Sequence, residues 1–469
     1  MMQGQASSSL TITFSLLALL LATCIGIVEH DVPSILVATS VGLLAGTVGL
    51  VRSGASRRLG TSQTLCVLFF MLAVAHIFFG FLLAGLSTQH TSIRSNAQNF
   101  FAQAMLINSI GILAGAVGYL WKLNGRTVSL IPGLPLLIDK NTAGKLFRVL
   151  VILGSALMFF AYWKLGFLDY LSEPSKWPFM RYITGDILGG SATDEWIVNR
   201  AMDLLTVSLP FVLIRMVKRP KPLGILLAAV GYAALLLPLR RANLLAVTMT
   251  FLILLGIERQ DAYRFTRKVI VSVALLYVLS QCIFLLGVFA NNIDPRGILT
   301  VSSTALPEVR DLGWTLSLLN GETLHGVTFA QALIPLPSIA SDWSSAHSLR
   351  AISTKLIGLD QTGETGGLRL TILGEGYINF GYFGAIGAGF LWGLAVGWCE
   401  KLLQATRKNT SLFEKYVVVL SFVWVCFLIY LAGTQAAASV KVGGLLVLGI
   451  AWVSKHRSGI SQTEAVPLT

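Results

Sequence analysis

Charged residues are scarce in this sequence. Only 12% of the 469 residues are Asp, Glu, Lys or Arg, whereas 54% are hydrophobic and the mean hydropathy is +0.73. A water-soluble domain carries about 25% charged residues, so one aqueous core cannot account for the chain. The apolar runs are continuous over about 18–22 residues, which favours membrane-spanning helices over the alternating strands of a barrel. The sequence therefore predicts an all-α polytopic membrane protein.

Other absences restrict the chemistry. The sequence has no phosphate-binding GxxxxGK[ST] loop and no soluble domain to hold ATP, which argues against an ATP-driven pump. The five cysteines lie in or beside apolar runs without metal-ligand spacing, so we expect small buried hydrophobes. The acidic residues of the long loops, Glu308 and Asp311 among them, form no metal-binding pair, and His325 and His347 stand alone. We predict no metal and no cofactor.

About twelve spans can be assigned from the apolar runs. They are predicted at residues 9–28, 33–51, 62–86, 100–121, 148–168, 201–217, 222–239, 242–257, 269–290, 378–400, 416–432 and 440–454. The first run lacks a basic flank before it and a cleavage pattern after it, which favours a first span over a removed signal peptide.

Lysine and arginine set the orientation of these spans. They gather in the connections after alternate spans, at residues 52–58, 122–148, 215–221, 259–268, 401–415 and 455–457. This is the positive-inside pattern, and it predicts that both termini are cytoplasmic. The same pattern explains the net charge of +13 without nucleic acid as a partner, and it leaves room for an anionic lipid-linked ligand.

We expect one membrane domain over residues 1–458, with a disordered tail at 459–469. Two long connections, at about 169–200 and 291–377, lie on the side opposite the basic loops. Segments 308–319 and 347–358 mix apolar and charged residues at near-helical spacing, and 327–338 is apolar but too short to span. These segments predict surface-lying or re-entrant helices, with an ordinary folded loop as the alternative. No internal repeat or pair of interrupted helices is evident, which disfavours a transporter.

Arginines on the side that the positive-inside rule disfavours are candidates for anion binding. Arg240 and Arg241 are adjacent in LPLRRANLL, a very short turn between two spans, where they must snorkel, pair with carboxylates or bind an anion. Guanidinium groups suit phosphate oxygens, whereas salt bridges or lipid headgroups are the alternative partners. Other arginines lie in the long loops: Arg181, Arg200, Arg296, Arg350 and Arg369. Arg200 can also pair locally with Asp203.

A polar cluster opens the apolar segment GGLRLTILGEGYINFGYFGAIGAGFLWG at 366–393. A carboxylate there, Glu375, is costly unless it is paired, hydrated or functional. If the segment is helical, Glu375 and Asn379 share one face and Tyr377 lies nearby. The glycines that follow predict close helix packing. A helix cap, or an ion pair with Arg369, is the alternative role for Glu375.

This segment resembles the bacterial oligosaccharide repeat-unit polymerases, the Wzy-type O-antigen polymerases. Members commonly carry a G-E-x-Y-x-N-F-G-x-x-G-like segment after the largest outer loop. The residues that match it here are Gly374, Glu375, Tyr377, Asn379, Phe380, Gly381 and Gly384. The stretch LPLRRANLL resembles the family's short arginine-containing segment between two middle spans. The close match covers about forty residues, and the plan of spans and loops extends it loosely.

The resemblance implies a membrane-embedded, GT-C-like glycosyltransferase of the bacterial inner membrane. It would join lipid-linked oligosaccharide repeat units on the periplasmic side, releasing undecaprenyl pyrophosphate without a metal. Arg240, Arg241 and Arg369 would bind the pyrophosphate, and Glu375 would act as general base or orient the acceptor. Arg181, Arg200, Arg296, Arg350, Tyr377 and Asn379 would contact substrate. A co-polymerase that regulates chain length is implied only by the resemblance.

Three other functions remain open. An O-antigen ligase shares the general plan, but its family leads us to expect a histidine motif in an outer loop, which the sequence does not show. A flippase of lipid-linked oligosaccharide predicts charged residues in many spans and internal repeats. A membrane scaffold would leave the adjacent arginines and Glu375 without a chemical role.

Overall fold

The computed structural model describes residues 32–59, 65–86, 94–124, 140–167, 189–238, 241–259, 308–333, 347, 351–352, 370–405, 411–433 and 440–449. The chain forms two compact units. The first comprises residues 1–127, 293–401 and 425–437, and the second comprises 128–292, 402–424 and 438–469. All regular elements of the described residues are helices, which confirms the predicted all-α class.

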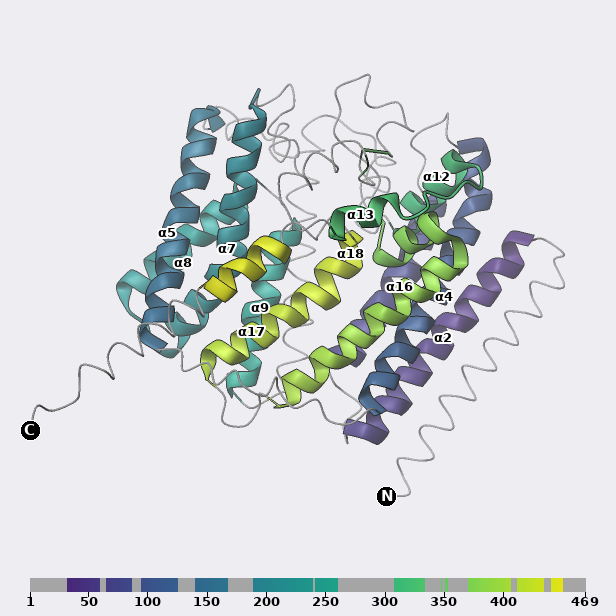
Figure 1. The fold of residues 1–469 in the computed structure, drawn as a ribbon, viewed down its shortest axis with the longest axis horizontal. Coiled ribbons are helices and arrows are strands. Elements are labelled where there is room, and N and C mark those ends of the chain that lie inside the picture. The colour runs from purple at the N-terminus through teal and green to yellow at the C-terminus, as the bar shows by residue number, and fades with distance from the viewer. Residues whose placement is uncertain are drawn as a thin grey trace, which may run out of the picture. The chain divides into compact units, whose positions relative to one another are not determined.

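The first unit is built on three long helices. These are α2 (Val32–Leu59), α3 (Leu65–Leu86) and α4 (Arg94–Asn124). Helices α2 and α3 both pack against α4, and α2 lies beside α4 along its length (Figure 1). A helix of 31 residues such as α4 is about 46 Å long, more than the hydrocarbon core of about 30 Å. The continuous apolar composition of α2 and α4 therefore produces helices long enough to span.

Helix α16 (Ile372–Ala405) packs against α4 through glycines. A Cβ atom added at Gly389 would collide with the carbonyl oxygen of Gly111, and one at Gly393 would collide with that of Gly115. Both members of this contact pair advance by four residues, so the two helices run parallel. The predicted close packing through small residues is confirmed, and the parallel direction is the one that the alternating spans require.

The chain reverses direction inside α16. Phe380 has φ −139° and ψ 18°, and Gly381 has φ 63°, a value that favours glycine. Beyond this point the helix returns along itself, because a Cβ at Gly376 would overlap the carbonyl of Gly384 and lie 2.9 Å from Ala388 Cβ. We call residues 372–379 the short arm and 382–405 the long arm. The prediction of one continuous span at 378–400 is thus wrong at its start, since the membrane-length helix begins after Gly381.

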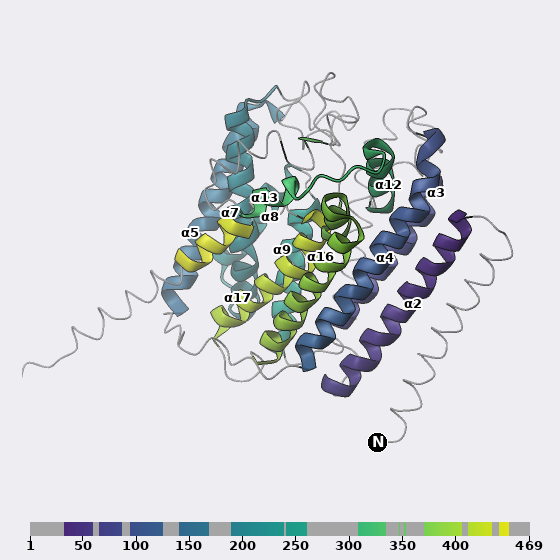
Figure 2. The same cartoon turned by 45° about the vertical axis from the view of Figure 1, so that its right-hand side comes forward.

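Helices α12 (Glu308–Leu319) and α13 (Val327–Leu333) lie in the predicted long connection. The helix predicted at 308–319 is confirmed, but it does not lie on a surface. It packs against α4 and α3 (Figure 2), and most of its residues are buried, including Glu308, Arg310 and Asp311. The charged residues predicted a position at the membrane surface, but polar partners stabilise them in the interior. Most of segment 347–358 lies outside the described residues.

The second unit is centred on α7 (Ala192–Lys218). Helices α5 (Lys140–Lys164), α8 (Pro222–Leu236) and α9 (Arg241–Arg259) pack against α7, and α17 (Leu412–Val423) packs against α9. An aromatic cluster joins Phe147 of α5, Phe211 of α7 and Tyr416 of α17. The hydroxyl of Tyr416 donates to the carbonyl oxygen of Val207.

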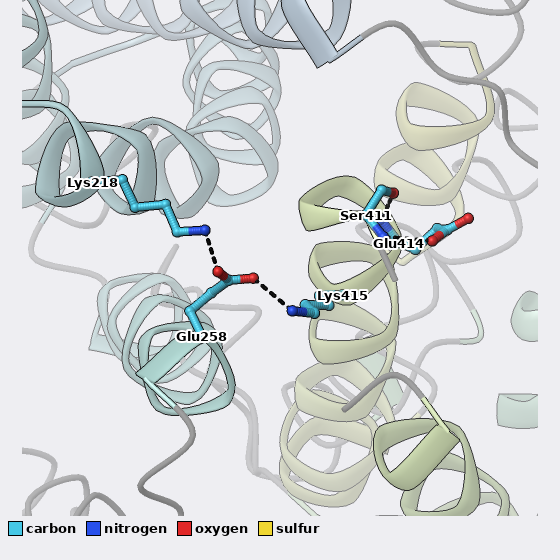
Figure 3. A network of polar contacts seen from close by, with 5 residues as sticks. All are labelled: Lys218, Glu258, Ser411, Glu414 and Lys415. Carbon is cyan, nitrogen blue, oxygen red and sulfur yellow. Dashed lines mark hydrogen bonds and ion pairs between the residues drawn. The ribbon is translucent and has the colours of Figure 1, made fainter. Parts of the chain in front are cut away.

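Ion pairs join helix ends in the second unit. At one end, Lys164 of α5 is 2.7 Å from Asp194, which also closes the capping box of α7 with Ser191. Elsewhere the end of α7, the end of α9 and the start of α17 meet, where Glu258 bridges Lys218 and Lys415 (Figure 3). The positive-inside pattern assigns those three ends to one side of the membrane, and the structure brings them together.

Five described helices are long and apolar enough to cross a membrane, and they include the N-terminal part of α2 and most of α4, α5, α7 and α16. Shorter apolar helices occupy 69–82, 222–236, 243–258 and 440–449. The predicted span at 416–432 is α17 followed by a π-helical segment, η3 (Trp424–Ile429), and α18 (Tyr430–Ala432). The predicted spans at 9–28 and 269–290 lie outside the described residues. The chain is therefore an all-α membrane protein.

Candidate active site

The short arm of α16 buries the carboxylate that the sequence singled out. Glu375 and Asn379 have 0% exposed surface, and the Asn379 amide donates a 2.8 Å hydrogen bond to the carbonyl oxygen of Glu375. The two residues therefore share one face of a helical turn, as predicted. Glu375 belongs to the first turn, where the positive end of the helix dipole favours a carboxylate.

Glu308 of α12 hydrogen-bonds to Thr371, the residue directly before the short arm. Its Oε2 accepts a 2.7 Å hydrogen bond from the Thr371 amide, and its Oε1 lies 2.6 Å from the Thr371 hydroxyl. Thr371 then accepts from the amide of Gly374, at 3.4 Å, and its carbonyl accepts from that of Glu375, at 2.9 Å. A residue 63 positions earlier in the chain thus fixes the start of the helix that carries Glu375.

Two further helices, α4 and α13, supply polar contacts around the short arm. Asn108 of α4 places its Oδ1 3.4 Å from the Thr371 hydroxyl. Thr328 of α13 accepts a 2.7 Å hydrogen bond from the amide of Asn379. Gln103 of α4 donates to the hydroxyl of Tyr377 at 3.2 Å. The residues of the resembling motif therefore lie where α4, α12, α13 and α16 meet.

Gly433 allows the Glu375 carboxylate to lie against the main chain. The residue has φ 49°, and a Cβ added there would collide with Glu375 Oε2. Just before it, the ring of Tyr430 packs on Phe69 and Trp392, and it lies 6.3 Å from the ring of His76. Glycine at 433 is therefore required both by the backbone and by the position of the carboxylate.

Several buried polar atoms near this cluster accept or donate no hydrogen bond within the described part of the chain. They are Asn379 Oδ1, Tyr430 Oη and His76 Nδ1. Buried polar atoms in native proteins are normally satisfied, and exceptions occur at sites that bind water, ions or ligands. Asn379 Oδ1 is one turn from Glu375, so an acceptor oxygen that could receive a hydroxyl donor lies beside the carboxylate.

Burial controls the charge state of Glu308. It raises the pKa of the Glu308 carboxyl from 4.5 to about 8, although the hydrogen bonds from Thr371 oppose the rise. Arg310 does not compensate this group, because its guanidinium binds Asp311 at 2.7 Å and lies 4.6 Å from the Trp314 ring centre. Glu308 is therefore largely protonated at neutral pH.

The predicted arginines are placed unevenly. Arg200 lies in the second unit and pairs with Asp203 at 2.8 Å, as predicted, with Trp196 5.9 Å from its guanidinium. Arg241 begins α9, but its side chain is outside the described residues. Arg181, Arg240, Arg296, Arg350 and Arg369 are also outside them. A shared arginine site for pyrophosphate therefore stays a prediction.

Sequence reasoning missed Glu308, Asn108 and Thr371 as parts of the site. The sequence considers Glu308 only as a possible metal ligand, whereas in the structure its carboxyl hydrogen-bonds to Thr371 at the start of α16. The available signal was the position of Glu308 at the start of an amphipathic segment, where a carboxylate is a common helix-start residue. His325 is exposed beside Thr323, with 3.3 Å between its Nδ1 and the threonine hydroxyl.

No protein-family model matches this sequence, and neither the curated proteins nor the solved structures contain a match.

Proposed function

We propose that this protein is an inner-membrane glycosyltransferase that polymerises lipid-linked oligosaccharide repeat units into O-antigen or a related surface polysaccharide. The proposal includes the twelve-span arrangement with cytoplasmic termini. The observation that carries it is the short arm of α16, which buries Glu375 and Asn379 among polar residues of three other helices. The motif that resembles the Wzy-type polymerases coincides with this arm and its reversal.

The reaction follows from the groups at the site. Glu375 accepts the proton of an acceptor sugar hydroxyl, and Asn379 Oδ1 orients that hydroxyl. The hydroxyl oxygen forms a new bond to the anomeric carbon of the donor while the bond from that carbon to the undecaprenyl pyrophosphate oxygen breaks. Arg240, Arg241 and Arg369 stabilise the negative charge on the leaving diphosphate, as a preorganised set of donors. Arg181, Arg200, Arg296, Arg350 and Tyr377 contact the glycan or the diphosphate.

The location of the site within the first unit supports this assignment. It lies beside the N-terminal half of α4 and the start of the long arm, whereas Lys122 and Lys401 lie near the C-terminal ends of these two helices. By the positive-inside rule the site then belongs to the periplasmic half of the membrane, where lipid-linked repeat units would be joined.

The test is the polysaccharide ladder of a strain that lacks the chain and carries plasmid-borne variants. Glu375→Ala, Arg240→Ala and Arg241→Ala should each leave a single repeat unit on the lipid core, with normal amounts of protein in the membrane. Gly433→Ala should act in the same direction, because its Cβ displaces the Glu375 carboxylate. Glu322→Gln, an exposed carboxylate after α12, is the matched control. Normal ladders in the first three variants would reject the assignment.

A second candidate is favoured by one observation. Helix α16 is interrupted at residues 380–381, and a π-helical segment precedes Gly433, which is left-handed. Interrupted helices that meet at a buried polar site are typical of transporters, which would make the chain an exporter of lipid-linked oligosaccharide. The same gel separates the functions. Loss of polymerisation leaves one capped repeat, whereas loss of export or of ligation leaves bare core.

A further inference from the structure

The long connection before α16 reaches the proposed site through one side chain. Both carboxyl oxygens of Glu308 hydrogen-bond to Thr371, the residue directly before the short arm. Glycine at 374, the first residue of the motif, permits this approach, since a Cβ there would lie 3.2 Å from Glu308 Oε1. Glu308 is therefore close to the short arm without belonging to the motif.

Burial of the Glu308 side chain favours its protonated form, and that form changes the hydrogen bonds around Thr371. The Thr371 hydroxyl has one hydrogen but two acceptors within reach, Glu308 Oε1 at 2.6 Å and Asn108 Oδ1 at 3.4 Å. A protonated Glu308 donates from Oε1 to Thr371 Oγ1, which frees the Thr371 hydrogen for Asn108. The other carboxyl oxygen still accepts from the Thr371 amide. An ionised Glu308 takes the Thr371 hydrogen, leaves Asn108 Oδ1 without it and buries a charge.

We propose that Glu308 is a positioning residue of the proposed reaction: its protonated carboxyl holds Thr371 and so fixes the short arm that carries Glu375. This inference rests on the proposed function. Both carboxyl oxygens of Glu308 hydrogen-bond to Thr371, so Glu308 acts on the reaction through the helix start. Protonated Glu308 thus fixes the position of the short arm, and the reaction slows when Glu308 ionises.

Other titratable groups around Glu308 have different roles. On α12, Asp311 and Arg310 neutralise each other, and Asp311 adds to the tendency of Glu308 to stay protonated. On α18, Tyr430 lies close enough to interact with Glu308 electrostatically, and His76 of α3 contacts the Tyr430 ring. Glu375 lies one turn beyond Thr371. These groups are unchanged in a Glu308→Gln variant, which makes the substitution selective.

The experiment measures polymerisation between pH 6 and pH 9, in membranes that contain the full chain and are supplied with lipid-linked repeat units from a strain lacking it. Half of the Glu308 carboxyls ionise near pH 8, so the wild-type rate should fall about two-fold at pH 8 and about ten-fold at pH 9. Glu308→Gln should remain active and lose this alkaline fall. Its amide donates to Thr371 Oγ1 and accepts from the Thr371 amide, as the protonated acid does. Glu322→Gln should follow the wild type.

Glu308→Ala should be slow at every pH, because both hydrogen bonds from Glu308 to Thr371 are then lost. The inference is overturned if Glu308→Gln keeps the wild-type alkaline fall, or if it is folded but inactive at every pH, which would make Glu308 a catalytic carboxylate. A second measurement does not depend on polymerisation. Hydrogen exchange of peptides covering 372–379, corrected for intrinsic rates, should speed up above pH 8 in wild type and not in Glu308→Gln. Equal exchange in the two proteins also overturns the inference. A chain that never makes polymer, yet shows the exchange difference, refutes the proposed function and leaves the positioning role of Glu308 intact.

Discussion

Adding one methyl group to the interface between α4 and α16 should destabilise the protein. In Gly393→Ala the new Cβ would overlap the carbonyl oxygen of Gly115, inside the 3.0 Å that real Cβ contacts respect, so the helices must separate by about 1 Å. A gap of this size forfeits about a quarter to a half of the dispersion energy of the contacts beside it. Overpacking of this kind costs about 1–3 kcal/mol, against about 0.5–1 kcal/mol gained by replacing glycine in a helix. The net loss should be about 1–2 kcal/mol.

Gly387 provides the matched control, because it lies on the same long arm and a Cβ there meets nothing within 4 Å. Gly387→Ala should be neutral or slightly stabilising. Gly115→Ala should fall between the two, since its Cβ would lie 3.0 Å from the Trp392 ring and 3.2 Å from the Gly389 carbonyl oxygen, distances that require a smaller displacement than at Gly393. The assay is the temperature at which half of the detergent-solubilised protein stays monodisperse. A Gly393→Ala variant as stable as Gly387→Ala would refute the close parallel packing.

Three further predictions concern the buried carboxyl of Glu308, the capping box of α7 and the ion pairs of Glu258. Because the pKa of Glu308 is raised, its full contribution to the free energy of unfolding is present below pH 4.5. This contribution falls by up to about 5 kcal/mol as the pH rises to about 8. Thermal unfolding of Glu308→Gln should lack this pH dependence, and an unchanged dependence would contradict the burial of the carboxyl. Asp194→Ala removes the capping box of α7 and the partner of the half-exposed Lys164, and should lower stability by about 1–2 kcal/mol in thermal unfolding, whereas no change would show that the cap is dispensable. Glu258→Ala removes the carboxylate that Lys218 and Lys415 share, so the two ammonium groups repel each other. The melting temperature should therefore fall more in dilute buffer than in about 1 M salt. Glu322→Ala should not change the melting temperature at either salt concentration.

The sequence was informative where one residue type carries one physical constraint. Long apolar runs predicted the helices, and alternating basic loops predicted the parallel direction of α4 and the long arm. The glycines after 381 predicted close helix packing, which the structure shows against α4, and the predicted ion pair between Arg200 and Asp203 forms across one helical turn. Each of these inferences depends on local composition or on spacing within one helix.

The reversal inside α16 was not predictable from hydropathy, because both arms are apolar and only the left-handed φ of Gly381 distinguishes the turn from a helix. The burial of α12 was missed for a related reason. Charged residues on an amphipathic segment predict exposure to water, and the sequence does not show that Thr371 hydrogen-bonds to Glu308 or that Arg310 pairs with Asp311. Contacts between residues 63 or more positions apart leave no trace in a single sequence.

The back-to-back contact of Gly376 and Gly384 also limits how this protein can change over time. When a larger side chain appears in most cores, a neighbour can shrink to make room. Here a Cβ atom at Gly376 would meet the main chain of Gly384, and one at Gly384 would meet the main chain of Gly376. Neither glycine can be replaced by a smaller residue. A gain of bulk at either position therefore has no single compensating change elsewhere, and the hairpin of α16 should be among the slowest parts of the chain to diverge.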